Sequence, residues 1–167
     1  KFKRYSKLAI TSRFVVSELD SLICNISDDS ENDFLDIVKS YKSNNEILVI
    51  LAGDRGLCGG FNSSVLKKAQ DYLDNSDNNV ELILFGRKAV QYFKNTSYKV
   101  IKYFENYNDT VTIDDVDYLL NDYTDMYLTK NYSKVTLLYN EFKTAVTSNL
   151  LFKQLFPVKL DKKNSSE

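Results

Sequence analysis

Hydrophobic residues in the first 27 positions recur at alternating spacings of three and four residues. This heptad repeat is typical of a helix that packs along a second helix, and Ser12 is its polar interruption. The apolar stripe needs a partner, which is either the domain that follows or a helix outside this sequence. We expect residues 1–27 to form a coiled-coil helix with a seam of Tyr5, Leu8, Val15, Leu19, Leu22 and Ile26.

Short apolar runs alternate with helical patterns from residue 46 onward. The run 46–52 is continuous, as in a strand buried on both faces, whereas 61–73 has apolar residues at helical spacing. Residues 27–33 are acidic and polar and predict a loop, and Thr112 with Asp115 fits a capping box at a helix start. We expect further helices at 34–41, 86–93 and 113–127, further strands at 80–85, 98–104, 134–139 and 142–147, and a stop at Phe156-Pro157.

This alternation of strands and helices predicts an α/β fold. Because right-handed crossovers connect neighbouring parallel strands, we expect a Rossmann-like domain with a largely parallel five-stranded sheet flanked by helices. The length of 167 residues and the apolar content of 43% suit one globular domain with a sizeable core.

Four of the chain's five glycines fall within eight residues, at Gly53, Gly56, Gly59 and Gly60. They follow the predicted strand 46–52 and precede a predicted helix. Glycine adopts backbone conformations that other residues reach only at a cost, so this turn is the first candidate for a functional site. In parallel α/β sheets such a turn lies at the carboxyl ends of the strands, where ligands and partners bind.

The composition excludes several classes of function. The sequence has no histidine and two cysteines, which removes histidine-dependent triads, histidine metal ligands and thiolate zinc sites. A net charge of −1 disfavours nucleic acid as a partner. No stretch reaches the ~18 consecutive apolar residues of a membrane span, so we expect no direct insertion into a bilayer.

Three interpretations of the glycine turn remain open on the residues alone. A Rossmann-like module could hold a small anionic ligand at 53–62, although the glycine spacing fits neither phosphate-binding motif and Asp54 adds negative charge. Cys58 could act as a redox thiol, with Arg55 as its only nearby activator. The turn could instead contact another protein, because exposed loops on rigid α/β scaffolds commonly carry recognition.

Two segments of the chain resemble one known family. The run Ile50-Leu-Ala-Gly-Asp-Arg-Gly-Leu-Cys-Gly-Gly-Phe-Asn62 resembles the signature of the gamma subunit of F-type ATP synthases. The later segment Val135-Thr-Leu-Leu-Tyr-Asn-Glu-Phe-Lys-Thr144, followed by Gln154-Leu-Phe-Pro157, is similar to a strand region of the same family. The order and spacing of both agree, and the resemblance spans about residues 1–158.

The resemblance implies a particular organisation. In gamma subunits, long N-terminal and C-terminal helices form an antiparallel coiled coil, and an α/β domain lies between them in sequence. Residues 1–27 then correspond to the remaining part of the N-terminal helix, 28–158 to the α/β domain and 159–167 to a polar tail. We expect this chain to be the middle of a longer protein, without the C-terminal helix.

The resemblance also implies a function. Gamma subunits are the rotor of the central stalk: they transmit torque between the membrane c-ring and the alpha/beta hexamer for proton-driven ATP synthesis. We therefore expect a non-catalytic subunit without cofactor or metal, peripheral to the cytoplasmic face of a bacterial inner membrane or the matrix face of a mitochondrial one. Its expected partners are the alpha, beta and epsilon subunits and the c-ring. The subunit contact turn implied by the family is Asp54, Arg55, Gly56, Leu57, Cys58, Gly59 and Gly60.

Overall fold

A computed structural model describes most of the chain, namely residues 16–18, 20–21, 36–56, 60–106, 113–129, 131–142 and 148–159. Several predicted features lie outside the described residues: all six seam positions of the coiled-coil helix, the loop 27–33, the start of the capping box and the middle of the glycine turn at Leu57, Cys58 and Gly59. Residues 36–38 are helical, within the predicted helix 34–41.

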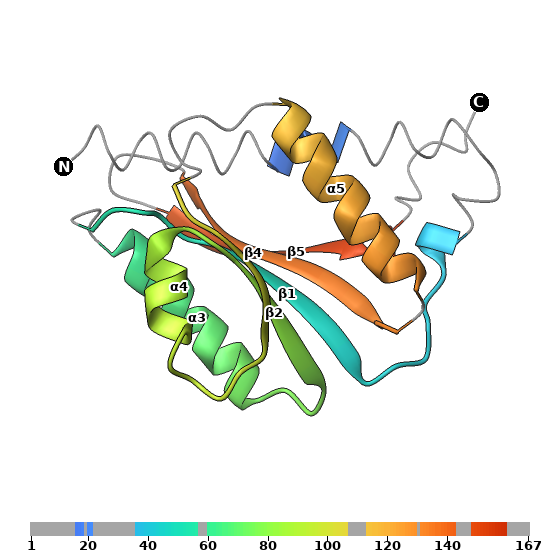
Figure 1. Ribbon diagram of the computed structural model, residues 1–167, viewed down its shortest axis with the longest axis horizontal. Coiled ribbons are helices and arrows are strands. Elements are labelled where there is room, and N and C mark those ends of the chain that lie inside the picture. The colour runs from blue at the N-terminus through green and yellow to red at the C-terminus, as the bar shows by residue number, and fades with distance from the viewer. Residues whose placement is uncertain are drawn as a thin grey trace.

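The described elements form one five-stranded sheet with helices on both faces (Figure 1). The strand order is β3-β2-β1-β4-β5; all neighbours pair in parallel except β4 and β5, which are antiparallel. The predicted α/β fold with a mostly parallel five-stranded sheet is therefore confirmed. The strands are β1 (Asn45–Leu51), β2 (Asn79–Phe85), β3 (Val100–Phe104), β4 (Lys134–Phe142) and β5 (Ser148–Phe156), and the helices are α3 (Phe61–Asp74), α4 (Arg87–Phe93) and α5 (Ile113–Leu128).

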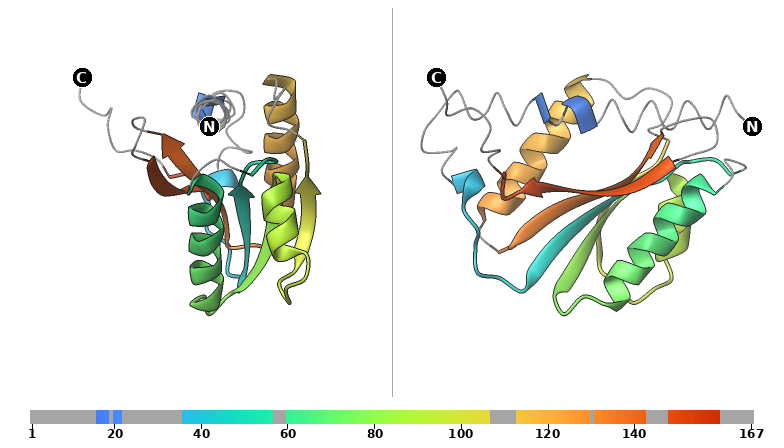
Figure 2. Two further views of the ribbon diagram at one scale, coloured as in Figure 1. Left: turned by 90° about the vertical axis from the view of Figure 1, so that its left-hand side faces the viewer. Right: turned by 180° about the vertical axis from the view of Figure 1, so that it is seen from behind.

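Each face of the sheet has its own apolar core. Helices α3 and α4 pack on one face, where Leu48 and Ile50 of β1 meet Val65 of α3. Helix α5 packs on the other face, where Ile47 and Val49 of the same strand are buried. Figure 2 shows the two layers from the side and from behind. This burial on both faces is why β1 has a continuous apolar sequence rather than an alternating one.

The predicted fifth strand at 142–147 is wrong. Phe142 is the last residue of β4, residues 143–147 lie outside the described part, and β5 begins at Ser148. Strand β4 continues past Tyr139 because β5 folds back along it, with Phe142 opposite Ser148. The predicted stop at Phe156-Pro157 is confirmed, since β5 ends at Phe156.

Strands β1 and β2 each carry a buried glutamate near the amino end, and neighbouring side chains pair with both carboxylates. Glu46 of β1 accepts hydrogen bonds from the Tyr72 hydroxyl and the Asn78 amide, both at 2.6 Å, and its carboxylate lies 3.5 Å from Lys134 Nζ. Glu81 of β2 faces the opposite side of the sheet. These partners are needed because an unpaired charge at either position would be strongly destabilising.

The second of these carboxylates, Glu81, accepts hydrogen bonds from the Lys99 ammonium and the Tyr132 hydroxyl. Burial raises the pKa of Glu81, but these two hydrogen bonds outweigh it, and the pKa is lowered from 4.5. Because the folded state then binds this proton less tightly than the unfolded state, the stabilisation is complete above pH 4.5 and is lost as the pH falls through the lowered pKa.

The substitution Glu81→Gln tests this pairing. We expect the variant to lose about 1 kcal/mol of unfolding free energy at pH 7, since it exchanges charge-assisted hydrogen bonds for neutral ones, and the Lys99 ammonium that loses its ionic partner is itself exposed. Urea unfolding between pH 7 and 3 should also show that the unfolding free energy of the variant falls less with decreasing pH than that of the parent chain. A variant whose acid decline matches the parent's would show that Glu81 is not the titrating group.

Candidate functional site

The glycine turn connects the end of β1 to the start of α3 (Figure 1). Strands β1, β2 and β3 are parallel, so their carboxyl ends meet at this edge of the sheet. Of the seven predicted contact residues, the structure describes Asp54, Arg55, Gly56 and Gly60, and the other three lie outside the described residues.

Asn62, in the first turn of α3, holds the turn against the end of β1. The backbone N–H of Gly53 donates to Asn62 Oδ1 at 2.7 Å, and Asn62 Nδ2 donates to the carbonyl of Arg55 at 3.0 Å. The Asn62 side chain therefore satisfies the N–H group at one end of the segment 53–55 and the carbonyl group at the other. Asn62 lies within the family signature but is not among the predicted site residues; an amide side chain that follows a glycine turn is the sequence signal for this role.

The substitution Asn62→Ala removes both of these hydrogen bonds. We expect it to lower the unfolding free energy by about 1–2 kcal/mol, the usual effect of leaving backbone groups without partners. Amide exchange at Gly53 should become faster. Asn62→Asp is the matched variant: it keeps the acceptor for Gly53 N–H and loses only the donor to Arg55, so its loss should be smaller.

Asp54, which follows β1, forms hydrogen bonds to the segments that follow β2 and β3. Its Oδ1 accepts the backbone N–H of Arg87, the first residue of α4, and the backbone N–H of Asn106, which follows β3, each at 2.8 Å. The Lys88 N–H also donates to the carbonyl of Gly53, at 3.1 Å. The carboxylate of Asp54 thus braces the turn, while the neighbouring Arg55 is exposed.

Among the described glycines, Gly86, between β2 and α4, has a positive φ. Its φ is +92°, whereas Gly60 has φ −78°. A Cβ on Gly86 would lie 2.1 Å from the carbonyl oxygen of Ala52, but one on Gly60 would meet no atom closer than Ser63 Oγ, at 4.0 Å. The sequence predicts Gly86 as the start of a helix, and its backbone requirement is a finding of the structure.

These contacts disfavour the anionic-ligand interpretation of the turn. The Asp54 carboxylate accepts a hydrogen bond from the first backbone N–H of α4, so this N–H is not open to a bound phosphate. The negative charge of Asp54 would also repel a phosphate at this position. The redox interpretation depends on Cys58, which lies outside the described residues. The third interpretation, contact with another protein, depends on neither of these features.

Comparison with known proteins decides the family. A family model described as ATP synthase matches residues 1–167, and the chain is 28% identical to the ATP synthase gamma chain of Chlorobaculum tepidum over 95% of its own residues. The chain belongs to the ATP synthase gamma chain family. It is also 29% identical to the ATP synthase gamma chain of Chloroherpeton thalassium, over 99% of its residues.

Both of these gamma chains are longer than the present sequence. The chain spans 56% of the length of the Chlorobaculum protein and 57% of the Chloroherpeton protein. Its fold is similar to that of a chain in the solved structure of the Tetrahymena thermophila mitochondrial ATP synthase central stalk and c-ring, with a TM-score of 0.58 at 20% identity. That match covers 91% of this chain and 71% of the other. Among the described residues, no helix is both long and apolar enough to cross a bilayer.

Proposed function

We propose that this chain is the globular part of a central-stalk rotor subunit, which transmits torque between the c-ring and the alpha/beta hexamer during proton-driven ATP synthesis. The observation that carries this proposal is the match of the whole sequence to a family whose similar members are ATP synthase gamma chains. In this role the chain makes and breaks no covalent bonds, and the chemistry takes place on other subunits of the complex.

The contact turn 54–60 is the proposed point of contact with neighbouring subunits. Asp54 acts as an internal brace, and the side chain of the neighbouring Arg55 lies at the surface of the turn. A turn fixed by Asp54 and Asn62 is suited to this role because a pre-organised loop loses less conformational entropy when a partner binds.

The proposed subunit has three parts along the sequence and lies at a membrane surface. Residues 1–27 are the part of an N-terminal coiled-coil helix nearest the globular domain, with the seam given above, 28–158 are a Rossmann-like domain, and 159–167 are a polar tail. The partners are the alpha, beta and epsilon subunits and the c-ring. The subunit lies at the membrane surface, on the cytoplasmic side in a bacterium or the matrix side in a mitochondrion.

Reconstitution of the complex tests this function. The full-length protein that contains this sequence should assemble with its alpha, beta and epsilon subunits and c-ring, and single-molecule recordings should show it rotating during ATP hydrolysis. Complexes assembled without it should show no rotation. Exclusion of the protein from the complex, or ATP turnover by the protein alone, would refute the proposal.

A further inference from the structure

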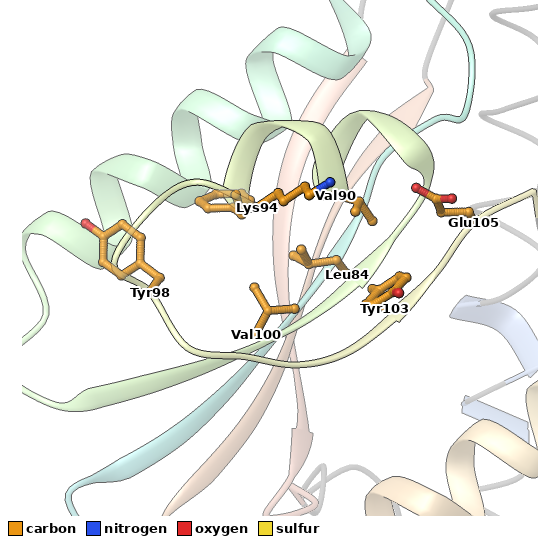
Figure 3. A pocket seen from close by; sticks show the side chains of 8 residues that line it. Leu84, Val90, Lys94, Tyr98, Val100, Tyr103 and Glu105 are labelled. Atoms are coloured by element: carbon orange, nitrogen blue, oxygen red, sulfur yellow. The ribbon is translucent and has the colours of Figure 1, made fainter.

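A groove of about 430 Å³ lies between α4 and strand β3, on the face of the sheet that α3 and α4 cover (Figure 3). Leu84 and Val100 lie between its two ends, which are marked by Tyr98 and Tyr103. The groove is separate from the contact turn, and nothing in the proposed function uses it. Its lining consists of Leu84, Val90, Phe93, Lys94, Tyr98, Val100, Tyr103 and Glu105.

Strand β3 borders the groove and is an edge strand of the described sheet, with β2 on one side and no described strand on the other. Exposed sheet edges pair readily with other chains unless charge, proline or a covering segment prevents it. The one charged residue of β3, Lys102, does not protect this edge, because its Nζ is held at 2.6 Å from both carboxylate oxygens of Asp122 on α5.

A β-bulge in β3 turns Tyr103 toward the groove. Leu82 pairs with Val100 but the next residue, Ile83, pairs with Lys102, so Ile101 is an extra residue in the strand. Without it, the two-residue alternation would carry Tyr103 to the α5 face. Instead Tyr103 lies beside the groove and is 63% exposed. Bulges commonly redirect a side chain at a binding edge, and here the redirected side chain is a large aromatic ring.

The opposite end of the groove is fixed in place. The Tyr98 hydroxyl donates to Asp74 and accepts a hydrogen bond from Gln70 at 3.0 Å, both from α3. Its ring packs edge-on against the buried Phe93, with centroids 6.3 Å apart. The groove therefore has a rigid end at Tyr98 and an open end at Tyr103.

Two opposite charges, Lys94 and Glu105, lie in the lining of this groove. Within the described part of the chain, neither Lys94 nor Glu105 has a side-chain hydrogen bond or an ion pair. A bound segment that placed an acidic residue at Lys94 and a basic residue at Glu105 would match both charges. Alternating polar and apolar residues are what an extended peptide presents to a groove beside a sheet edge.

We propose that this groove binds an extended segment of a protein partner, which adds to the free edge of β3. An apolar side chain of the segment fills the space between Tyr98 and Tyr103, and flanking acidic and basic residues meet Lys94 and Glu105. The backbone of β3 supplies hydrogen bonds, and the two tyrosines supply aromatic contact area. This inference rests on the proposed function in one respect, namely that the partner is a subunit of the same complex.

Photo-crosslinking in the assembled complex tests the inference. The substitution Tyr103→p-benzoylphenylalanine in the full-length protein should give adducts that map to one short segment of a neighbouring subunit. Tyr118→p-benzoylphenylalanine is the control, because Tyr118 lies on α5 and is 65% exposed, close to the 63% of Tyr103. It should give no adduct with that segment.

A second pair of variants asks whether Tyr103 contributes to binding. With p-benzoylphenylalanine moved to Val90, which lines the groove and makes none of the proposed charge contacts, Tyr103→Lys should reduce the adduct at least fivefold, while Tyr103→Phe should leave it within twofold. Adducts that are absent, dispersed over several subunits or formed with a second copy of this chain overturn the groove proposal, even when the complex assembles and turns. A protein that never enters the complex refutes the proposed function and the groove proposal together.

Discussion

The substitution Gly86→Ala is expected to destabilise the domain more than any of the other proposed substitutions. A Cβ at this position would lie 2.1 Å from the Ala52 oxygen and 2.6 Å from its carbonyl carbon, and both are backbone atoms that cannot rotate away. The positive φ of +92° adds strain for any residue with a Cβ. Such a backbone conformation alone costs about 1–3 kcal/mol. With the steric overlap, we expect a total loss of at least about 4 kcal/mol from a domain stability on the order of 5–15 kcal/mol.

Gly60→Ala is the matched control for this effect. Gly60 has an ordinary φ of −78°, and the space around its missing Cβ is open to 4.0 Å. Its unfolding free energy should change by less than about 1 kcal/mol, the range expected for a helix N-cap that exchanges glycine for alanine. Urea unfolding of both variants measures the difference. Equal stability of the two would show that the contact between Gly86 and Ala52 does not constrain the fold.

Asp54→Ala is expected to have the second largest effect, a loss of about 2–3 kcal/mol of unfolding free energy. The substitution removes an ionised acceptor from two backbone amides, and charge-assisted hydrogen bonds of this kind contribute about 1.5–3 kcal/mol each before screening by solvent. Amide exchange at Arg87 and Asn106 should accelerate together, because both donate to the same oxygen.

Asp54→Asn separates the acceptor from its charge. The asparagine keeps an oxygen for Arg87 and Asn106 but carries no negative charge, so we expect it to retain more than half of the stability lost in the alanine variant. If the alanine and asparagine variants were both as stable as the parent chain, Asp54 would not be a brace, and its place in the turn would need another explanation.

The sheet could be predicted from the sequence because its signals are local. The continuous apolar run before Ala52 and the helical spacing from Phe61 to Leu73 each determine an element without reference to the rest of the chain. The error at 142–147 has a different origin. The length of β4 depends on its antiparallel partner, and no local pattern states that Phe142 pairs with Ser148.

The roles within the candidate site could be predicted only in part. The glycine cluster correctly drew attention to the turn, but the bonds that brace it reach across the sequence: Asp54 is 33 residues from Arg87 and 52 from Asn106. The need for glycine at position 86 arises from the close approach of Ala52, which directly follows the neighbouring strand β1. Such requirements arise when strands are assembled side by side, so they appear in the three-dimensional arrangement and not in the spacing of residues.

The position of β1 in the middle of the sheet has a mechanical consequence. Seven of its residues are in register with β2 and five with β4, in the same direction on both sides. A pull on the adjoining turn, directed along this strand, would shear both ladders at once instead of peeling them apart bond by bond. The turn next to Gly53 is therefore attached to a strand that is paired on both sides. A force on this turn would move the whole sheet as one rigid body.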